Sequence, residues 1–222
     1  MKIKKVLVAN RGEIAIRIFR ACTEVNVKTV GVYTFEDRYS LHRYKADESY
    51  QIGEDNAPLK PYLDIKEIIR IALKSGADAI HPGYGFLSEN ADLAQQCEDN
   101  GLIFVGPKVT VLQSLGDKIT AKEVAVANNI PVIKSNENPL DSIETALEEA
   151  SKIGYPVMLK AASGGGGRGM RVIREAGELK KAFNESKREA LNAFGDDTVF
   201  LEKFVANPKH IEIQIVADNY GN

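Results

Sequence analysis

The sequence of 222 residues has no tryptophan, only two cysteines and no long apolar run. Cys22 and Cys97 lie far apart and form no Cys-x-x-Cys pair, so neither a disulfide framework nor a zinc site is predicted. No stretch is long enough to span a bilayer. The apolar run near the N-terminus is short, and the acidic Glu13 follows it, which is not typical of a signal peptide. We therefore expect a cytoplasmic protein without a membrane segment.

A strong charge of either sign is also missing. The formal net charge is −2, and lysine and arginine are scattered along the chain. Because nucleic acids and anionic membranes bind clustered basic residues, neither is an expected partner. The hydrophobic and charged fractions, 44% and 27%, are ordinary for a globular protein of one large or two small domains.

The first part of the chain alternates strand and helix patterns. Strands are predicted at residues 6–9, 29–33, 79–81 and 102–105, and helices at 14–25, 64–75 and 88–100. Asp64 is the expected N-cap of the second helix, with Glu67 completing a capping box. This alternation predicts a parallel sheet with helices on both faces, in one α/β domain over residues 1–115.

The pattern changes in residues 116–222. After a helix at 117–128, we expect helices at 142–153 and 178–191 and strands at 156–162, 170–174 and 198–205, which together form a smaller α+β unit. Residues 210–216 alternate strictly between isoleucine and polar side chains, which predicts another strand, and residues 218–222 resemble a hairpin turn. Because that hairpin lacks its second strand, we expect a fragment of a longer protein or a strand supplied by another chain.

Dinucleotide binding is disfavoured by a shortage of glycine after the first strand. The segment Asn10-Arg11-Gly12-Glu13 has one glycine where the dinucleotide fingerprint needs three. Asp37 follows the second strand and could imitate the acid that holds a ribose. Without the other glycines, a scaffold domain of Rossmann-like shape is the better interpretation.

The run of glycines at 164–167 is the strongest chemical signal. It lies between Lys160 and Arg171 and joins two predicted strands. Glycines let backbone N–H groups turn toward phosphate oxygens, and the basic side chains, including Arg168, add charge. A Walker loop would open into a helix, whereas these residues predict a hairpin that closes over phosphates. The alternative is a flexible linker, which strands flanked by basic residues disfavour.

Two further segments carry candidate binding groups. The strand ending at Val205 could pair its free backbone groups with adenine while Glu202 accepts the exocyclic amine. His210, Glu212 and Gln214 share the polar face of the next predicted strand. Residues 81–86 read His-Pro-Gly-Tyr-Gly-Phe at the carboxyl end of a strand, where ligands of open α/β sheets bind. Tyr84 would be presented there, and a structural role for His81 is the simpler interpretation.

Taken together, these motifs resemble biotin carboxylase, the ATP-grasp component of biotin-dependent carboxylases. The resemblance extends over the whole chain and rests on residues 9–15, 81–90, 116–118, 164–171 and 209–214. Segments 18–22, 42–48 and 189–195 are most similar to the version found in pyruvate carboxylase. The implied fold is a Rossmann-like pre-ATP-grasp domain followed by an ATP-grasp lid at about 132–204, with the chain ending before the catalytic subdomain.

The resemblance also implies a reaction and its partners. MgATP and bicarbonate would form carboxyphosphate, which decarboxylates and carboxylates N1 of biotin on a carrier domain. A carboxyltransferase domain would then use the carboxybiotin, and the N-terminal domain would form a homodimer. The alternatives are an acyl-CoA carboxylase subunit, another ATP-grasp ligase, and a non-catalytic nucleotide-binding or dimerisation module.

The resemblance assigns roles residue by residue. Implied nucleotide contacts are Lys118, Lys160, Gly166, Gly167, Met170, Glu202, Lys203, Phe204, Val205 and His210. Tyr84 is implied near biotin, and Arg20 and Glu24 in the dimer interface. The family's metal-binding glutamates, bicarbonate site and catalytic arginine are expected beyond Asn222, so no catalytic or metal-binding residue is assigned within this chain. On that basis the chain by itself is expected to be inactive.

Overall fold

The computed structural model describes residues 2–116, 118–136, 140–162, 170–218 and 220–222, without the side chains at 118–119 and 193–194. The chain divides into two compact units, Met1–Asn129 and Ile130–Asn222, which we call unit 1 and unit 2. None of the helices in the described ranges combines the length and apolar character that a membrane span requires.

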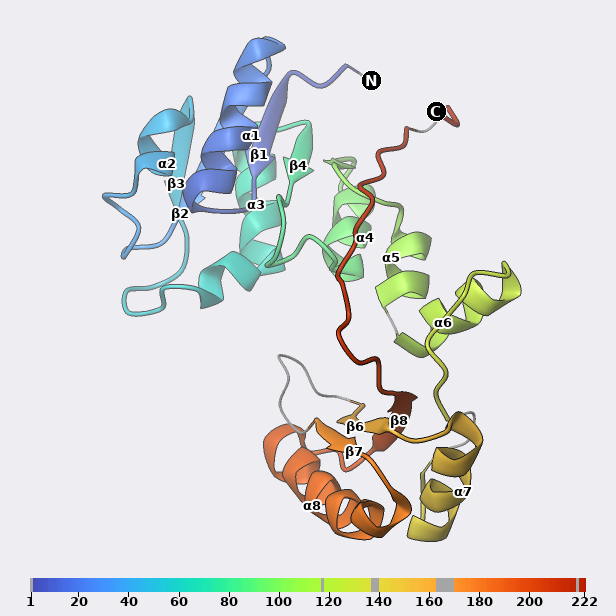
Figure 1. Ribbon diagram of the computed structural model, residues 1–222. Coiled ribbons are helices and arrows are strands. Elements are labelled where there is room, and N and C mark those ends of the chain that lie inside the picture. The colour runs from blue at the N-terminus through green and yellow to red at the C-terminus, as the bar shows by residue number, and fades with distance from the viewer. Residues whose placement is uncertain (1, 117, 137–139, 163–169, 219) are drawn as a thin grey trace. The chain divides into compact units, whose positions relative to one another are not determined.

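Unit 1 is built on a parallel sheet of five strands (Figure 1). The strands are β1 (Lys5–Val8), β2 (Lys28–Tyr33), β3 (Glu48–Gln51), β4 (Ala79–His81) and β5 (Ile103–Phe104). Their order is β3-β2-β1-β4-β5, and every neighbouring pair is parallel. The strand order reverses between β1 and β4, so the carboxyl ends of these two strands form the switch point where ligands of such sheets bind.

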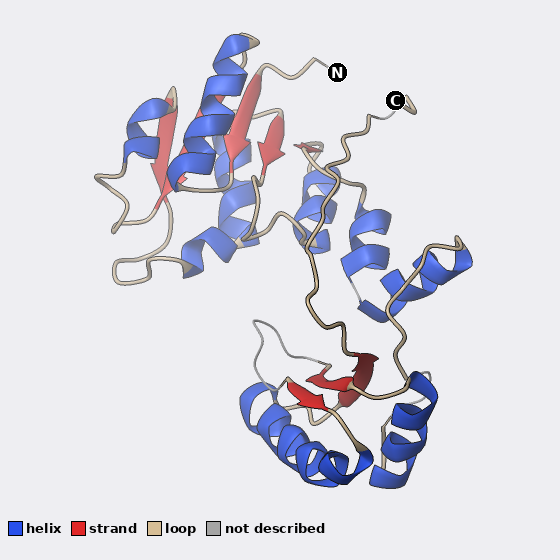
Figure 2. Cartoon of the chain, in the orientation of Figure 1, coloured by secondary structure: helices blue, strands red, loops and turns tan. Residues whose placement is uncertain are grey.

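Helices cover both faces of this sheet (Figure 2). The helical elements of unit 1 are α1 (Gly12–Glu24), α2 (Leu41–Lys45), the 3-10 turn η1 (Lys60–Leu63), α3 (Ile65–Ser75), α4 (Ala91–Asp99), α5 (Val109–Gly116) and α6 (Lys118–Ala127). Helix α1 buries Ala15, Ile18 and Phe19 against Val6 and Val8 of β1. The prediction of a parallel sheet with helices on both faces is confirmed.

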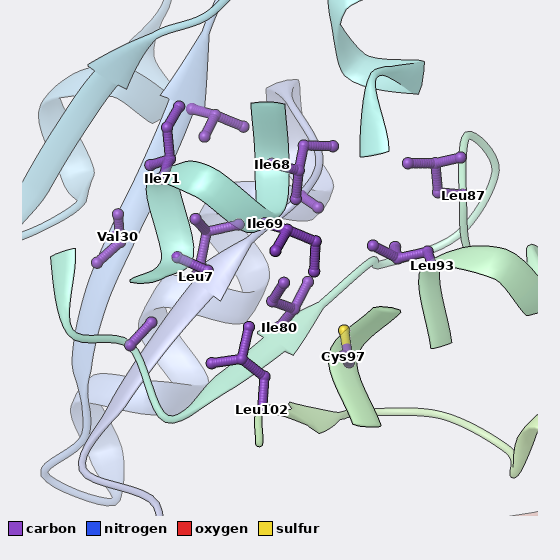
Figure 3. Packing of buried hydrophobic residues seen from close by; sticks show 14 of the residues in the cluster. Leu7, Val30, Ile68, Ile69, Ile71, Ile80, Leu87, Leu93, Cys97 and Leu102 are labelled. Carbon is purple, nitrogen blue, oxygen red and sulfur yellow. The ribbon is translucent and has the colours of Figure 1, made fainter. Parts of the chain in front are cut away.

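The opposite face of the sheet holds the larger core (Figure 3). Leu7, Val30 and Ile80 project from β1, β2 and β4 toward three isoleucines of α3, and Leu93 and Cys97 add the buried side of α4. Alternate residues of β1 therefore serve different cores, which explains why the four residues of this short strand are almost all buried.

The helix starts predicted from capping residues agree in part with the structure. Asp64 caps α3 by accepting a hydrogen bond from the Glu67 amide at 3.0 Å, as predicted. The expected reciprocal half of the capping box is wrong, because the Glu67 carboxylate binds Arg70 instead, at 2.7 and 2.8 Å. The predicted helix at 88–100 starts later, since Asn90 is the N-cap and accepts from the Leu93 amide.

Four elements of unit 1 were not predicted: α2, β3, η1 and α5. Strand β3 has no fully buried residue and mixes polar with aromatic side chains, so it lacks the period-2 pattern of a strand with one buried face. Its pairing with β2 stabilises it, and that is a tertiary interaction.

Unit 2 is an antiparallel sheet of three strands with two helices on one face (Figure 1). Its elements are α7 (Ile143–Ile153), β6 (Val157–Ala161), β7 (Arg171–Ile173), α8 (Ala176–Phe194) and β8 (Val199–Lys203), and the strand order is β7-β6-β8. Val157, Leu159 and Leu201 face the helices and are fully buried, packed with Leu179 and Ile173. The predicted helices and strands from 142 to 205 are confirmed with small shifts at their ends.

The predicted strand at 210–216 is wrong for this structure. Residues 206–217 run as a loop (Figure 2), and Ile211, Ile213 and Ile215 are 77–83% exposed. A strand forms when its backbone groups pair with a neighbour, and within the described ranges no segment pairs with these residues. Within the segment predicted to turn, the Asp218 carboxylate accepts hydrogen bonds from the amides of Tyr220 and Asn222.

Candidate functional site

The sheet of unit 2 has one face that its helices do not cover. Because strand side chains alternate, the residues between the buried ones point to this second face. They are Met158 and Lys160 of β6 and Phe200 and Glu202 of β8, and all four are partly buried. The face therefore combines an apolar surface with one cation and one anion, a composition suited to a ligand with an aromatic ring and phosphates.

Lys160 and Glu202 form an ion pair across the two strands. Met158 lies opposite Glu202 and Lys160 lies opposite Phe200, so the two charged residues are diagonal neighbours on the same face. The Lys160 Nζ donates a hydrogen bond to Glu202 Oε2, and the two side chains are 30% and 22% exposed. A lysine ammonium has three donors, so this one keeps donors for a second anionic partner such as a phosphate.

The outer edge of β8 offers a matched donor and acceptor. Ser135 bridges Glu202 in antiparallel fashion, with the Lys203 amide donating to the Lys134 carbonyl at 2.7 Å. Beyond this bridge, and within the part of the chain that the structure describes, the Lys203 carbonyl and the Val205 amide have no hydrogen-bond partner. These groups are two residues apart in an extended segment, so they project from the same edge. They fit the donor and acceptor edge of a purine.

Two basic residues near the candidate site, Arg171 of β7 and Lys203 of β8, have structural partners. Arg171 was predicted to add charge to the phosphate loop, but it points to the helix face and binds Glu189 at 2.7 Å and Ser186 at 3.0 Å. The hydrogen bond to Glu189 raises the pKa of Arg171. Lys203 donates to the carbonyls of Gly154 and Tyr155 at 2.7 and 2.9 Å. Of these two residues, only the main chain of Lys203 is therefore available to a nucleotide.

The remaining predicted nucleotide contacts lie in neighbouring segments or outside the described residues. Met170, immediately before β7, is 45% exposed. His210 lies in the loop after β8 with a side chain that is 87% exposed, and its Nε2 is 3.7 Å from the Glu212 carboxylate. Lys118 begins α6, and its side chain lies outside the described residues. Gly166, Gly167 and Arg168 also lie outside them, although β6 and β7 on either side are antiparallel neighbours, as a hairpin requires.

The second candidate region is the switch point of unit 1. Asn10 follows β1, and the loop at 82–86 follows β4. Asn10 is buried and donates from Nδ2 to the carbonyls of Pro82 and Tyr84 at 2.7 and 2.9 Å. The Tyr84 side chain is 62% exposed, and its hydroxyl donates to the Glu13 carboxylate. The structure thus places an exposed Tyr84 at the carboxyl ends of β1 and β4, the position that the sequence predicted for it.

Asp37 has a structural role at the same edge. Its carboxylate accepts two hydrogen bonds from Arg11, at 2.6 and 2.5 Å, one from Tyr62 at 2.8 Å and one from Ser40 at 2.9 Å. Burial tends to raise the pKa of Asp37, but these hydrogen bonds and the Arg11 charge outweigh it and lower the pKa to about 2. Because the carboxylate is fully engaged, the idea that it imitates a ribose-binding acid is not supported.

Arg20 and Glu24 lie one turn apart on the exposed side of α1. Together with Phe19, Thr23 and Lys45 they line a surface hollow of about 310 Å³. A hollow that combines an aromatic ring with both charges is able to receive side chains of another protein surface.

Comparison with known proteins identifies the class to which this fold and these sites belong. Residues 2–112 match the family model described as "Biotin carboxylase, N-terminal domain", and residues 117–222 match "Carbamoyl-phosphate synthase L chain, ATP binding domain". The chain belongs to the biotin carboxylase family. Among curated proteins, the pyruvate carboxylase of Bacillus subtilis is 54% identical over 220 residues, which cover 99% of this chain and 19% of that protein. The chain thus spans about a fifth of such relatives.

Two solved structures extend the comparison. A biotin carboxylase from Campylobacter jejuni in complex with β-γ-ATP is 44% identical with a TM-score of 0.90, over all of this chain and 49% of that one. The biotin carboxylase domain dimer of Hydrogenobacter thermophilus 2-oxoglutarate carboxylase, with MgADP, ADP and bicarbonate, is 45% identical with a TM-score of 0.82, over 93% of this chain and 45% of that one.

Sequence reasoning missed several partners of the candidate site residues. The Asn136 side chain accepts from the Leu201 amide at 2.6 Å, which ties the segment before α7 to β8. Asn10 and Glu13 contact the loop at 82–86 from more than 70 residues away in the sequence. Asn10 follows β1 and Glu13 lies in the first turn of α1. The one signal in the sequence for these contacts was that both residues come soon after a strand predicted to be parallel to β4.

Proposed function

We propose that the protein carrying this sequence catalyses the ATP-dependent carboxylation of carrier-bound biotin with bicarbonate, through carboxyphosphate. This chain contributes the nucleotide-binding lid and the domain that presents Tyr84 to biotin. The observation that carries the proposal is the Lys160–Glu202 pair on the uncovered sheet face, next to the free backbone groups of β8. The match of residues 2–112 to the biotin carboxylase N-terminal domain and of residues 117–222 to an ATP-binding domain supports the same reaction class.

ATP would bind unit 2 through two kinds of contact. The adenine edge fits the Lys203 carbonyl and the Val205 amide, with Met158, Phe200 and Phe204 near the ring. The phosphates would draw Lys160 away from Glu202, since the ammonium can hold a phosphate as a point charge. Glu202 would then be free to accept from the adenine amine. We assign Lys118, Gly166, Gly167, Met170 and His210 as further contacts from the family resemblance.

Replacing Lys160 tests the proposed role of the ion pair. In the whole protein, Lys160→Gln should raise the KM for ATP about 10- to 100-fold, because a hydrogen bond to a charged group contributes about 1.5–3 kcal/mol. The measurement is bicarbonate-dependent ATP cleavage at varied ATP. The control is Lys180→Gln, which removes an exposed lysine of α8 and should leave the KM unchanged. An unaltered KM in Lys160→Gln would contradict the assignment.

Biotin and the final acceptor need separate assays. Free biotin should stimulate ATP cleavage by the whole protein in the presence of Mg²⁺ and bicarbonate, and no stimulation would overturn the proposed reaction. We propose pyruvate as the acceptor, supported by 54% identity to a pyruvate carboxylase. Formation of oxaloacetate from pyruvate would support this, whereas carboxylation of acetyl-CoA or propionyl-CoA would identify an acyl-CoA carboxylase.

We also propose that α1 forms part of a homodimer interface. The hollow beside Arg20 and Glu24 supports it, because a two-fold axis would place opposite charges of the two copies face to face. The charge-reversing variant Arg20→Glu should lower the dimer fraction in sedimentation experiments, and Glu24→Arg in the same chain should restore it. A dimer fraction unaffected by Arg20→Glu would exclude this surface.

A further inference from the structure

The loop after β4 has an unusual backbone. Gly83, Gly85 and Phe86 all have positive φ values, of 69°, 67° and 42°. Glycine accepts this region without cost, but Phe86 does not, and such a conformation persists only where the surroundings impose it. The loop is therefore held in place by contacts outside its own sequence, and those contacts can be named.

Asn10 is the first of these contacts. Its side chain is buried and spans the gap between the carboxyl ends of β1 and β4. Its two amide protons go to the carbonyls of Pro82 and Tyr84, and its Oδ1 accepts from the Arg11 amide at 2.8 Å. Asparagine is the side chain of this size that supplies two donors and an acceptor together, whereas aspartate would place negative charge against two carbonyls.

Close packing supports the same arrangement. A side chain at Gly83 would bring its Cβ to 2.7 Å from Asn10 Nδ2, so the loop lies directly on this amide. The Gly83 amide donates to His81 Nδ1 at 3.0 Å. The Phe86 ring packs on Tyr62 with centroids 5.3 Å apart. The main chain on both sides of Tyr84 is thereby defined before any ligand binds.

Glu13 defines the other end of Tyr84. It lies in the first turn of α1, three residues after Asn10, and its carboxylate accepts the Tyr84 hydroxyl proton in a hydrogen bond. A phenol has one donor and two acceptor positions. With the donor directed to Glu13, the Tyr84 oxygen is left as an acceptor, and it suits a ligand that offers an N–H group.

We propose that Asn10 and Glu13 are positioning residues for Tyr84: Asn10 holds its main chain and Glu13 directs its hydroxyl, so that the phenol oxygen accepts a hydrogen bond from a ureido N–H of biotin. This inference rests on the proposed function for its ligand. It adds the segment after β1 to the biotin-binding region and gives the Tyr84 oxygen a defined direction of hydrogen bonding.

Kinetics of the whole protein test the inference with free biotin as the probe. Glu13→Ala should raise the KM for biotin about 2- to 10-fold, the range expected for one hydrogen bond, and leave the KM for ATP unchanged. Glu13→Gln keeps an acceptor oxygen and should restore most of the loss. In a Tyr84→Phe background, Glu13→Ala should have no further effect, and additive effects would overturn the inference. Glu98→Ala, an exposed change on α4, is the matched control.

The role of Asn10 is tested in the same way, by comparing the effects of a substitution on the kinetics with biotin and with ATP. Asn10→Ala should raise the KM for biotin while biotin-independent ATP cleavage continues, and a fall in ATP cleavage with an unchanged KM for biotin would overturn its role. Circular dichroism of the variant confirms that the sheet has formed. Gly83→Ala, which crowds Asn10 without removing its donors, should reproduce the Asn10→Ala phenotype.

A titration separates this inference from the proposed function. The hydrogen bond to Glu13 raises the pKa of Tyr84. In protein labelled with ¹³C at the tyrosine ring, the Tyr84 signal, assigned with Tyr84→Phe, should titrate at lower pH in Glu13→Ala. An identical titration in both proteins would overturn the contact whatever the reaction. If the titration shifts but unaltered protein shows no response to biotin, the proposed function fails, and with it the ureido ligand.

Discussion

Asp37 shows how one residue organises the edge of a sheet. Its carboxylate accepts hydrogen bonds from Arg11, in the segment after β1, and from the hydroxyl of Tyr62, in the 3-10 turn η1. Tyr62 is fully buried, and the pair with Asp37 raises its pKa further beyond the effect of burial. The network thus supports the segment after β1 and, through Phe86, the loop that carries Tyr84.

Breaking this network should destabilise unit 1. Asp37→Asn leaves Arg11 and Tyr62 facing a neutral amide and should lower the free energy of unfolding by about 2 kcal/mol. This is less than the roughly 3–5 kcal/mol of a fully buried pair, because the Arg11 side chain is 40% exposed. Urea denaturation of the chain measures the change. The adjacent exposed Glu36→Gln is the control and should stay within about 0.5 kcal/mol.

Acid should weaken unit 1 in two steps. Burial lowers the pKa of His42 and His81 below 6.5, so the unfolded chain binds protons more readily than the folded one, and stability falls as the pH drops below about 6.5. The pKa of Asp37 is about 2 in the folded chain against an ordinary 3.8. The stabilising contribution of its carboxylate is therefore complete above about pH 4 and is lost as the pH falls toward 2.

His42→Gln tests the first step. Glutamine can still donate to the Val32 carbonyl, which His42 Nε2 contacts at 3.2 Å, but it does not titrate. The urea midpoint should therefore change less between pH 7.5 and pH 5 than it does in the parent protein. His210→Gln, at an exposed position, should retain the parent's pH dependence. If the urea midpoint of His42→Gln falls as much between pH 7.5 and pH 5 as that of the parent protein, a group other than His42 causes the loss.

At the scale of elements, alternate side chains of β6 have different roles: those on one face stabilise the core of unit 2, and those on the other face are the proposed nucleotide contacts. Leu159 is fully buried against the helices, while Met158 faces the open side. Leu159→Ala should cost about 2–5 kcal/mol of unfolding free energy. Met158→Ala should cost less and instead raise the Kd for ATP. Urea denaturation and calorimetric titration with ATP give the two values, and equal stability losses would contradict the assignment of faces.

At the scale of the whole molecule, each unit has its own core. The buried clusters of unit 1 draw on residues 6 to 112, and that of unit 2 on residues 140 to 201. Leu159→Ala should therefore increase amide hydrogen exchange in β6, β7 and β8 and leave β1, β2 and β4 protected. Equal loss of protection in both units would show that they unfold as one.

Elements with a strong local pattern were predictable. The apolar strands β1 and β2, the capped helix α3 and the alternating β6 carry their signals in sequence, because each buries one face or is fully buried. Strand β3 does not, since pairing with β2 stabilises it. The segment at 210–216 fails in the opposite sense: its pattern is typical of a strand, but a pattern supplies no pairing partner.

The sequence by itself determined the kinds of group available: a glycine run with lysine before it, an extended segment with an acid, and a tyrosine between two glycines after a strand. These follow from residue type and spacing, which are local properties. Tertiary structure alone decided which groups are free. Arg171 and Asp37 are committed to structural partners, Lys160 faces Glu202, and Asn10 and Glu13 meet Tyr84. The physical reason is that neighbours in space determine whether a charged group or a hydrogen-bond donor is available to a ligand. Those neighbours come from distant parts of the sequence, as when parallel pairing of β1 with β4 brings residues 10 and 84 together.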